Sequence, residues 1–521
     1  MDGVAPSPAR ISAPRAPAPD VAQTRAELVR LRPDLVERFD QTVPAANAAI
    51  LGRLLTALRR EPLPRLTARG PHTDPNLFRV VFTPGTIVIF PTTGAKAVVD
   101  GGAVSEPGAL ARLIWPESAL ATELDNSVAN LALAMAAQPG GGDEDALRHA
   151  EGDPDGLGRL EQLVLDGHPL HPCCRTREGM TTEDVLRYAP EHRVTVRLRE
   201  LAVPPDAWRG DGPPVLLAHP WQARRLLAEH PWLRDVGETG PMRPLMSLRT
   251  FAPTDGGPHV KTAVDVRMTS AVRTVSPAAV HNGPRLSALL STMASGLEIL
   301  RETGTGQVRG ERRMAHLIRE APQPGEDEAV VPLGALGAGT PPLVVQAVSR
   351  AGGDPYRWLE DLAKIWWPPL MHLLDRGVAL EAHGQNTLVG LRKGRPARLF
   401  YRDFGGVRVS AQRLQEHGYA VPELIGDLPC DDPAELRSKV AAAALGAVAT
   451  ELITLLERHL GADRARLWAI IAGAIRRTGT ADAEALITEP LPVKATTAMR
   501  LAAEPLDDVW CHLDNPMAGA R

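Results

Sequence analysis

Oxygen-bearing side chains lie at the spacing of a magnesium–nucleotide site between residues 381 and 406, EAHGQNTLVGLRKGRPARLFYRDFGG. Asn386 precedes an Asp-Phe-Gly sequence that begins at Asp403, and protein kinases hold magnesium with an Asn and with the Asp of such a sequence. Gln385 stands where the loop of a kinase would supply a catalytic Asp, and a Gln cannot accept a proton from an alcohol. The segment therefore predicts magnesium–nucleotide binding through Glu381, Asn386 and Asp403 rather than base catalysis by a kinase.

A second segment, SLRTFAPTDGGPHVKTAVDVRMTSAVR at 247–273, has the composition of an anion-binding site. Strand alternation places Ser247 and Arg249 on one face of a first strand, and Lys261 lies early on the strand that returns after TDGG. Residues 269 to 273 are typical of a turn that enters a helix, where free backbone N–H groups favour anions. A solvated polar strand face would give the same spacing, so spacing alone leaves both interpretations open.

A third segment, GHPLHPCCRTREGM at 167–180, carries two histidines that each precede a proline, which makes the local backbone extended and stiff. As metal ligands, His168 and His171 lack a third partner nearby. As anion contacts they fit better, together with Arg175 and Arg177. A loop whose histidines cap neighbouring backbone groups is the alternative that the residues leave open.

The elements that must position these segments can be predicted from periodicity. Helical periodicity runs from 22 to 60, a hairpin is expected at 78–99 with its turn at Pro84-Gly85, and a helix is expected from Pro355 to a stop at Gly377. The turn KGRP then predicts a hairpin within 381–406. We expect a disordered lead at 1–21, a mostly helical N-terminal region at 22–165, a β-rich region at 166–350 and a mixed C-terminal region at 351–521.

Bulk composition excludes several classes of protein. A net charge of −4 gives no argument for binding nucleic acid or an anionic membrane. Four cysteines without a Cys-x-x-Cys pair predict neither a zinc site nor a disulfide framework. The start of the chain lacks the apolar run of a signal peptide, and we expect no membrane-spanning stretch. These features indicate a cytoplasmic protein.

Taken together, the motifs resemble the IucA/IucC family, the NRPS-independent siderophore (NIS) synthetases, over roughly residues 165 to 517. The matching stretches are GHPLHP at 167–172 with Arg175, Arg177 and Gly179, HPWQ at 219–222, SLRT at 247–250 followed by Lys261, Thr269 and Arg273, EAHGQN at 381–386, RDFGG at 402–406, LPVKATTAMRL at 491–501 and NPM at 515–517. The resemblance implies an α+β fold shaped like a cupped hand. Homodimers are common in the family.

The resemblance also implies a reaction. A carboxylate attacks the α-phosphate of ATP, pyrophosphate leaves, and an amine or alcohol then displaces AMP to form an amide or ester. The acid would be a di- or tricarboxylic acid, with citrate as the first expectation, and the cofactors would be ATP and Mg²⁺. Because a carboxylate is already ionised at neutral pH, the first step needs no base, which accounts for Gln385.

Residue roles follow from the resemblance. Arg273, His383 and Lys261 would be catalytic, and Lys494 and Arg500 would border the acceptor or the distal carboxylate. The residues implied to bind ATP are His168, Ser247, Arg249, Thr250, Lys261, Arg273, Gln385 and Asn386. Those implied to hold the reacting carboxylate are Thr269, Ser270, Arg273 and His383.

Two other functions remain open on the sequence. A kinase-like small-molecule phosphotransferase would release ADP and would need an Asp base, which the motif lacks. A non-catalytic or repurposed scaffold that binds nucleotide or siderophore would be expected to lose some of the cationic residues, and these are present. A repurposed ATP-dependent amide ligase of other secondary metabolism is a further alternative.

Overall fold

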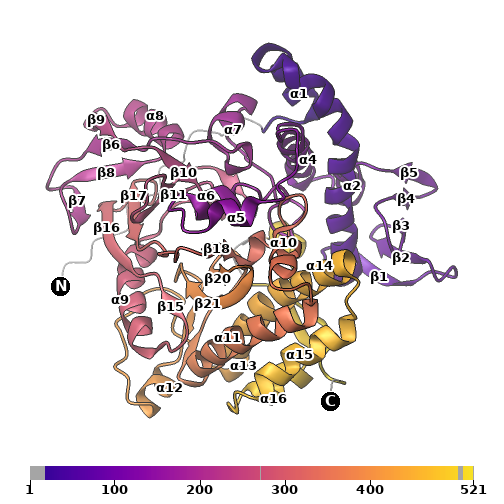
Figure 1. The fold of residues 1–521 in the computed structure, drawn as a ribbon. Helices are drawn as coiled ribbons and strands as arrows, with labels where there is room; N and C mark the ends of the chain where they lie inside the picture. Colours follow the sequence, from indigo (N-terminus) through magenta and orange to yellow (C-terminus); the bar gives the residue numbers. More distant parts are fainter. Residues whose placement is uncertain (1–17, 270, 503–507, 520–521) are drawn as a thin grey trace, which may run out of the picture.

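The computed structural model describes residues 18–269, 271–502 and 508–519 (Figure 1). Of the expected disordered lead, 1–21, residues 1–17 lie outside the described residues. Its last four residues differ from the expectation, because Ala18 is buried and the side chain of Asp20 caps the first helix by accepting a hydrogen bond from the backbone of Gln23 at 2.9 Å. Ordered structure therefore begins before Val21.

Helices and one antiparallel sheet form the N-terminal region, drawn in indigo and violet in Figure 1. The long helix α2 buries Phe39, Ile50 and Leu54 on one face and packs against α4. The predicted hairpin at 78–99 is confirmed by the antiparallel pairing of β2 with β3. The elements are α1 (Val21–Leu31), α2 (Val36–Arg60), β1 (Leu66–Pro71), β2 (Leu77–Phe82), β3 (Thr86–Pro91), β4 (Ala97–Val99), β5 (Gly102–Val104), α3 (Pro107–Ile114), α4 (Leu120–Ala136), α5 (Ala146–Ala150) and α6 (Gly156–Glu161).

Strands dominate the next part of the chain. A six-stranded sheet has the order β10-β11-β12-β17-β16-β7, and β6, β8 and β9 form a smaller sheet beside it. The elements are α7 (Thr182–Tyr188), β6 (Arg199–Ala202), β7 (Trp208–Gly210), β8 (Val215–Ala218), α8 (Pro220–Glu229), β9 (Arg234–Glu238), β10 (Met242–Pro244), β11 (Thr250–Pro253), β12 (His259–Thr262), β13 (Arg267–Met268), β14 (Ala271–Val272), α9 (Pro277–Met293), β15 (Glu298–Ile299), β16 (Glu302–Val308), β17 (Ala315–Arg319), β18 (Glu328–Pro332) and α10 (Leu343–Arg350).

Helices of the C-terminal region, orange to yellow in Figure 1, pack around a hairpin that carries the predicted magnesium motif. The expected helix α11 is capped by Asp354, and Trp358 donates a hydrogen bond from Nε1 to the carbonyl of Gly394 at 2.8 Å. The elements are α11 (Pro355–Asp375), β19 (Val378–Ala379), β20 (Thr387–Arg392), β21 (Arg395–Tyr401), β22 (Arg408–Val409), α12 (Ala411–Glu416), α13 (Pro433–Val440), α14 (Thr450–Leu460), α15 (Arg464–Arg476), α16 (Ala483–Thr488), β23 (Leu491–Lys494), α17 (Thr496–Leu501) and β24 (Trp510–Leu513).

One sheet joins the last two regions. Its order is β15-β21-β20-β18, so the hairpin β20–β21 is flanked on both sides by strands from before residue 350. The largest hydrophobic core likewise runs from Leu147 to Met517. The structure is thus mixed α+β, as predicted. The boundary between the middle and C-terminal regions at residue 350 stays a prediction.

One helix among the described residues, Pro433–Leu460, is long and apolar enough to span a membrane, contrary to the expectation from the sequence. Its most apolar 18-residue window is 72% buried inside the protein. A helix that is buried to this extent is typical of a protein core. It is formed without a break by α13, the π-helical Ala441–Ala449 and α14.

Candidate active site

Lys261 and Asp403 form an ion pair at the centre of the candidate site, with 2.5 Å between Nζ and Oδ2. Lys261 lies on β12 opposite Thr250 of β11, and Asp403 follows β21. Asp403 has a φ of 71°, an uncommon conformation for a residue other than glycine. The fold thereby joins a predicted phosphate ligand to a predicted metal ligand that lies 142 residues away.

Buried charges keep this pair ionised. Burial lowers the pKa of Lys261, which Asp403 opposes. Burial by itself would raise the pKa of Asp403, but Lys261 and Arg249 hold that pKa well below its usual range. A carboxylate that remains anionic at every physiological pH suits a metal ligand or a partner for a lysine.

The SLRT segment differs from its predicted conformation. Ser247 and Arg249 do not share a strand face, because they lie in the connection between β10 and β11, where Leu248 has a φ of 66°. Ser247 Oγ accepts a hydrogen bond from the backbone N–H of Thr250 at 3.2 Å. The guanidinium of Arg249 donates to the carbonyl of Thr274 at 2.7 Å. A tight loop, not strand alternation, thus places Arg249 beside the Lys261–Asp403 pair.

The segment that carries Thr269 and Arg273 also differs from the prediction. It forms the short hairpin β13–β14 rather than a helix start, and helix α9 begins only at Pro277 with Ser276 as its cap. Arg273 donates a hydrogen bond from its NH2 group to Thr269 Oγ1 at 2.5 Å. The two predicted carboxylate ligands are therefore adjacent, whereas Ser270 lies outside the described residues.

Arg273 stands in a strongly cationic environment. Burial lowers its pKa to about 10, and the charges of Arg249 and Arg177 contribute, while Asp403 and Glu381 oppose them. A guanidinium with this pKa is still charged at pH 7. The same interactions place Arg273 within electrostatic reach of both predicted acidic metal ligands.

The HGQN loop is tightly folded on itself. His383 Nδ1 accepts a hydrogen bond from the N–H of Gln385 at 3.2 Å, and the His383 carbonyl accepts one from the N–H of Asn386 at 2.9 Å. Burial lowers the pKa of His383, although the neighbouring Glu381 and Asp403 oppose the shift. His383 is thus neutral at pH 7, and because Nδ1 accepts, Nε2 carries the proton and can donate one hydrogen bond.

Close backbone approaches require glycine around this loop. A Cβ on Gly406 would lie 1.8 Å from Oε2 of Glu381, so only glycine lets the RDFGG and EAHGQN motifs meet. A Cβ on Gly384 would lie 2.6 Å from the backbone of Gly334, in the 3₁₀ turn Leu333–Ala335 that follows β18. These contacts hold the loop against the shared sheet.

Glu381 is bound by two lysines of the C-terminal region. Its Oε1 lies 3.0 Å from Nζ of Lys494 and 4.0 Å from Nζ of Lys439. Asp508 completes the group at 3.1 Å from Lys494 and 3.0 Å from Lys439. Burial by itself would raise the pKa of Glu381, but Lys494, His383 and Lys439 lower it overall. Lys439, which no motif singled out, thus joins the predicted site.

Glu381, Asn386 and Asp403 offer oxygen atoms that suit Mg²⁺, which usually takes one or two carboxylates together with phosphate oxygens and water. In the structure each of the two carboxylates is held by lysine. Among the described residues no group of three or more His, Cys, Asp or Glu side chains is arranged to hold a metal ion. The three side chains therefore fit a metal shared with a bound triphosphate, and assigning Mg²⁺ to them stays a prediction.

His168 lies among the same cations. Its ring is exposed, and Nδ1 accepts a hydrogen bond from the N–H of Leu170 at 3.2 Å. Crowding by surrounding protein lowers the pKa of His168, and the charges of His383, Arg53 and Lys494 lower it further. The GHPLHP loop thus brings His168 to the HGQN loop and the C-terminal motif.

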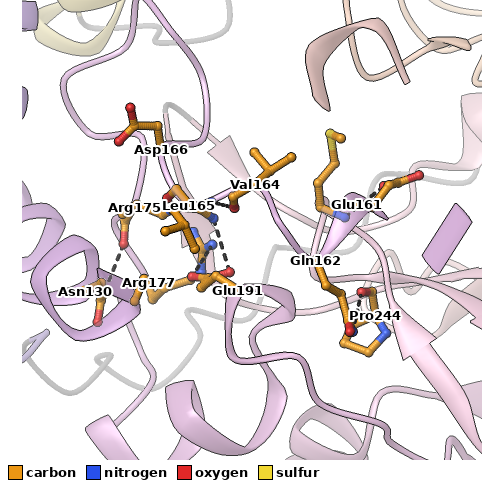
Figure 2. Close-up of polar contacts among 12 residues, drawn as sticks. Asn130, Glu161, Gln162, Val164, Leu165, Asp166, Arg175, Arg177, Glu191 and Pro244 are labelled. Atoms are coloured by element: carbon orange, nitrogen blue, oxygen red, sulfur yellow. Dashed lines mark hydrogen bonds and ion pairs between the residues drawn. The ribbon is translucent and has the colours of Figure 1, made fainter. Parts of the chain in front are cut away.

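Arg175 and Arg177 do not face a site for a substrate anion, contrary to the interpretation from the sequence, because both pair with a buried glutamate. Figure 2 shows both guanidinium groups turned toward Glu191, at 3.2 Å and 3.3 Å from its carboxylate oxygens. Arg175 also donates to the carbonyl groups of Val164 and Leu165. All three charged side chains are buried, and they fix the loop that carries His168.

A buried ion pair that the sequence did not reveal connects two motifs. Glu161, the last residue of α6, lies with Oε1 2.7 Å from the NH2 group of Arg402 in RDFGG. Its Oε2 accepts a hydrogen bond from the N–H of Met246, just before SLRT, at 3.0 Å. Arg402 also donates from Nε to the carbonyl of Gln385 at 2.9 Å. Glu161 lies in a short helix without any motif, so no local signal could have found it.

Glu302 is a second buried acid that the sequence did not single out. It faces α9 so closely that a Cβ on Gly283 would lie 1.6 Å from Oε2. Burial raises the pKa of Glu302 to about 7, with Asp403 adding to the shift and Lys261 opposing it. Its cross-strand neighbour is Arg319 on β17. The Lys261–Asp403 pair thus belongs to a larger buried network of charges.

Arg500 is held apart from Lys494, the other residue predicted for the acceptor side. Its Nε donates to Oε2 of Glu123 at 2.6 Å, and its NH2 group contacts the other carboxylate oxygen. Both side chains are largely buried. Arg500 therefore anchors the C-terminal segment to α4, and the structure does not bring it to the cluster around Glu381.

Comparisons with known proteins identify the fold. The fold is that of siderophore synthetases. It matches the petrobactin biosynthesis protein AsbB of Bacillus anthracis with a TM-score of 0.76 and 19% identity, over 94% of this chain and 98% of that one. It also matches ATP-bound aerobactin synthetase IucA of Klebsiella pneumoniae with a TM-score of 0.72 and 20% identity, over 91% and 99%.

Sequence relatives lead to the same class. Residues 157–213 and 210–338 match the model of the IucA / IucC family, and residues 356–504 match that of the "Ferric iron reductase FhuF-like transporter". Staphyloferrin A synthase of Staphylococcus aureus is 26% identical over 429 residues, 70% of this chain and 73% of that protein. Aerobactin synthase of Escherichia coli is 28% identical over 340 residues, 51% and 58%. The chain belongs to the IucA/IucC family of NIS synthetases and is a ligase.

Proposed function

We propose that this ligase activates a di- or tricarboxylic acid, citrate first, by transfer of AMP from ATP and then joins it to an amine or alcohol. The observation that carries the proposal is the convergence of Lys261, Arg249 and Arg273 on one acidic residue, Asp403, beside a loop that holds Gln385 in place of a base. Such a site can neutralise a triphosphate and a carboxylate together, which is what adenylation of an acid demands.

In the first step, a carboxylate oxygen attacks the α-phosphate and pyrophosphate leaves. Arg273 would bridge the carboxylate and the α-phosphate, and Thr269, Ser270 and His383 would orient the acid. Neutral His383 suits this role because it can donate a hydrogen bond without a second proton. The side chains assigned to the phosphates are His168, Ser247, Arg249, Thr250 and Lys261, and those assigned to the nucleotide are Gln385 and Asn386.

Mg²⁺, when bound, would neutralise charge on the β- and γ-phosphates. Asp403, Glu381 and Asn386 are the side chains that would hold it. The lysines that now contact the two carboxylates, Lys261 and Lys494, would then be free to contact substrate oxygens. In the second step an amine or alcohol attacks the acyl carbon and AMP leaves.

The names of several relatives support citrate and an amine. They include D-ornithine–citrate ligase and L-2,3-diaminopropanoate–citrate ligase of Staphylococcus aureus. We therefore place the chain in siderophore biosynthesis, in the cytoplasm where ATP is available, and expect a homodimer. The alternatives from the sequence are a phosphotransferase and a repurposed ligase.

The nucleotide product tests the proposal. With citrate, ATP, Mg²⁺ and hydroxylamine as surrogate acceptor, turnover should yield AMP, pyrophosphate and a hydroxamate in equal amounts, measured by chromatography and by the colour of the ferric hydroxamate. Omission of the acid is the control and should abolish pyrophosphate release. Stoichiometric ADP would contradict the proposal and favour the phosphotransferase.

A further inference from the structure

Helix α17 begins without a cap from its own sequence. Its N-cap residue, Ala495, has no side chain that can accept a hydrogen bond. Instead, Oε2 of Glu61 accepts hydrogen bonds from the backbone N–H groups of Thr497 and Ala498, both at 2.8 Å. Glu61 directly follows α2 and is buried. A carboxyl group in this place satisfies the unpaired N–H groups at the start of the helix.

The start of α17 sets the position of Lys494. Only Ala495 separates Lys494, the last residue of β23, from the helix. The N–H of Ala495 donates to the carbonyl of Val509 at 2.8 Å, which fixes the backbone between β23 and α17. Lys494 reaches Glu381 at 3.0 Å from there. A shift at the beginning of α17 would therefore move the lysine relative to the HGQN loop.

Charge indicates what Lys494 would bind. Lys494 and Lys439 both contact Glu381 and Asp508, and the rings of His383 and His168 lie nearby. When Mg²⁺ takes Glu381, as in the proposed function, Asp508 alone opposes the two lysines, and the surplus positive charge attracts a carboxylate and repels a protonated amine. The chemistry of this corner therefore favours the distal carboxylate of the acid over the amine substrate.

We propose that Glu61 is a positioning residue for the acid substrate, because by capping α17 from the end of α2 it holds Lys494 where it meets the distal carboxylate. The inference rests on the proposed function, since it takes the substrate to be a di- or tricarboxylic acid. Glu61 does not touch the substrate. It acts through α17, whose residue Thr496 also donates to the carbonyl of Leu170 in the His168 loop at 3.3 Å.

The positioning role of Glu61 can be tested through its protonation state. Burial raises its pKa to about 7, while its bonds from Ala498 and Thr497 oppose the shift. The other groups that face it are the guanidinium of Arg69 on β1 and the thiol of Cys511 on β24, whose pKa burial raises above its usual value. Glu302, whose pKa is also about 7, titrates in wild type and variant alike, so a difference between the two proteins in that range belongs to Glu61. An ionised carboxylate accepts stronger hydrogen bonds than a neutral carboxyl group.

The test compares the wild-type chain with Glu61→Gln, which mimics the neutral carboxyl group, at pH 6 and pH 8. Acid-dependent exchange between ATP and labelled pyrophosphate is measured with citrate, succinate or 2-oxoglutarate, whichever the wild type uses best. At pH 8 the variant should show a KM for the acid about three- to tenfold higher, as for one weakened charged hydrogen bond. At pH 6 the two proteins should agree within about twofold, and the KM for ATP should be unchanged at both values.

Asp463→Ala is the matched control, because Asp463 caps α15 by accepting from the N–H of Arg466 at 2.7 Å and α15 carries no assigned site residue. Its KM for the acid should equal that of the wild type. Equal values for wild type and Glu61→Gln at pH 8, or an equal rise in Asp463→Ala, would overturn the role of Glu61. A wild type that neither exchanges pyrophosphate nor binds any of the three acids by calorimetry overturns the proposed function, and this role with it.

Discussion

Arg273 is the side chain best suited to join two anions. Its guanidinium donates to Thr269, remains charged at pH 7 and lies within electrostatic reach of Arg249, Asp403 and Glu381. A planar guanidinium offers parallel N–H groups to two oxyanions at once, whereas a lysine is a point charge on a flexible stem. The role of Arg273 therefore depends on shape as well as charge.

Arg273→Lys should keep the charge and lose the alignment of carboxylate and α-phosphate. We expect a loss of about 2–4 kcal/mol in transition-state stabilisation, comparable to removing one preorganised donor. That corresponds to roughly 10²- to 10³-fold in kcat/KM. Affinity for ATP should fall less, because Arg249 and Lys261 remain. Steady-state kinetics beside ATP titration calorimetry measure both quantities, and turnover within a few-fold of the wild type would show that Arg273 is peripheral.

Asp403→Asn should raise the concentration of Mg²⁺ needed for half-maximal rate by about tenfold and lower kcat, because a hard cation loses an anionic oxygen. The substitution also leaves the buried Lys261 without its partner, so the melting temperature should fall. Lys261→Met separates the two effects. It should weaken ATP binding without raising the requirement for Mg²⁺, and an unchanged requirement in Asp403→Asn would remove Asp403 from the metal site.

At the scale of elements, loops at the ends of strands carry most of the site, whereas Lys261 and Thr250 lie on the paired strands β12 and β11. SLRT connects β10 to β11, Thr269 and Arg273 belong to the short hairpin β13–β14, and RDFGG follows β21. Buried acids then fix these loops: Glu161 ties SLRT to RDFGG, and Glu61 ties α2 to α17. Each acid is far in sequence from what it holds.

The pH dependence of the free energy of unfolding should reveal the raised pKa of Glu61. Its folded pKa of about 7 lies above the ordinary value of 4.5, so its contribution to stability is fully present below about pH 4.5 and is lost as pH rises through 7. The full loss is about 3 kcal/mol. Glu61→Gln has no such titration. Between pH 5 and 8 the wild type should therefore lose stability relative to the variant, as measured by urea unfolding.

Glu302, whose pKa is also raised to about 7, titrates in both proteins and cancels in this comparison. Parallel pH profiles for wild type and variant would show that the pKa of Glu61 is not raised. A variant that is more stable at pH 8 but has a higher KM for the acid would separate the positioning role of Glu61 from a purely structural one.

At the scale of the whole molecule, the N-terminal, middle and C-terminal regions depend on one another. The hairpin β20–β21 lies between β15 and β18 of the middle region, and the largest core spans the chain from Leu147 to Met517. The N-terminal region contributes Glu61 and Glu123 to the C-terminal segment. The active site is therefore assembled by contacts between regions.

Expression of residues 351–521 alone should yield a fragment without a cooperative thermal transition. It would expose both edges of the hairpin β20–β21 and much of the core around α11. Circular dichroism during heating measures the transition, with the full chain as control. A sharp transition in the isolated fragment would mean that the C-terminal region is an independent domain.

The sequence by itself determined the local elements and the inventory of chemical groups. The turn at Pro84-Gly85, the cap at Asp354 and the hairpin around KGRP were predicted correctly, because turn residues, caps and periodicity act over a few residues. The order of the motifs likewise indicated the family. Predictions that required tertiary context failed: the SLRT strand proved to be a loop, and the expected helix start at 269–273 proved to be a hairpin.

Only the tertiary structure decided which charges meet. Arg175 and Arg500 look like ligands in the sequence, yet buried glutamates bind both, whereas Lys439 lies in no motif and reaches Glu381. Burial changes the energy of a charge so strongly that its partner is set by what is packed beside it, and that neighbour can lie hundreds of residues away. Glu61 and the α17 backbone, 436 residues apart, are such a pair.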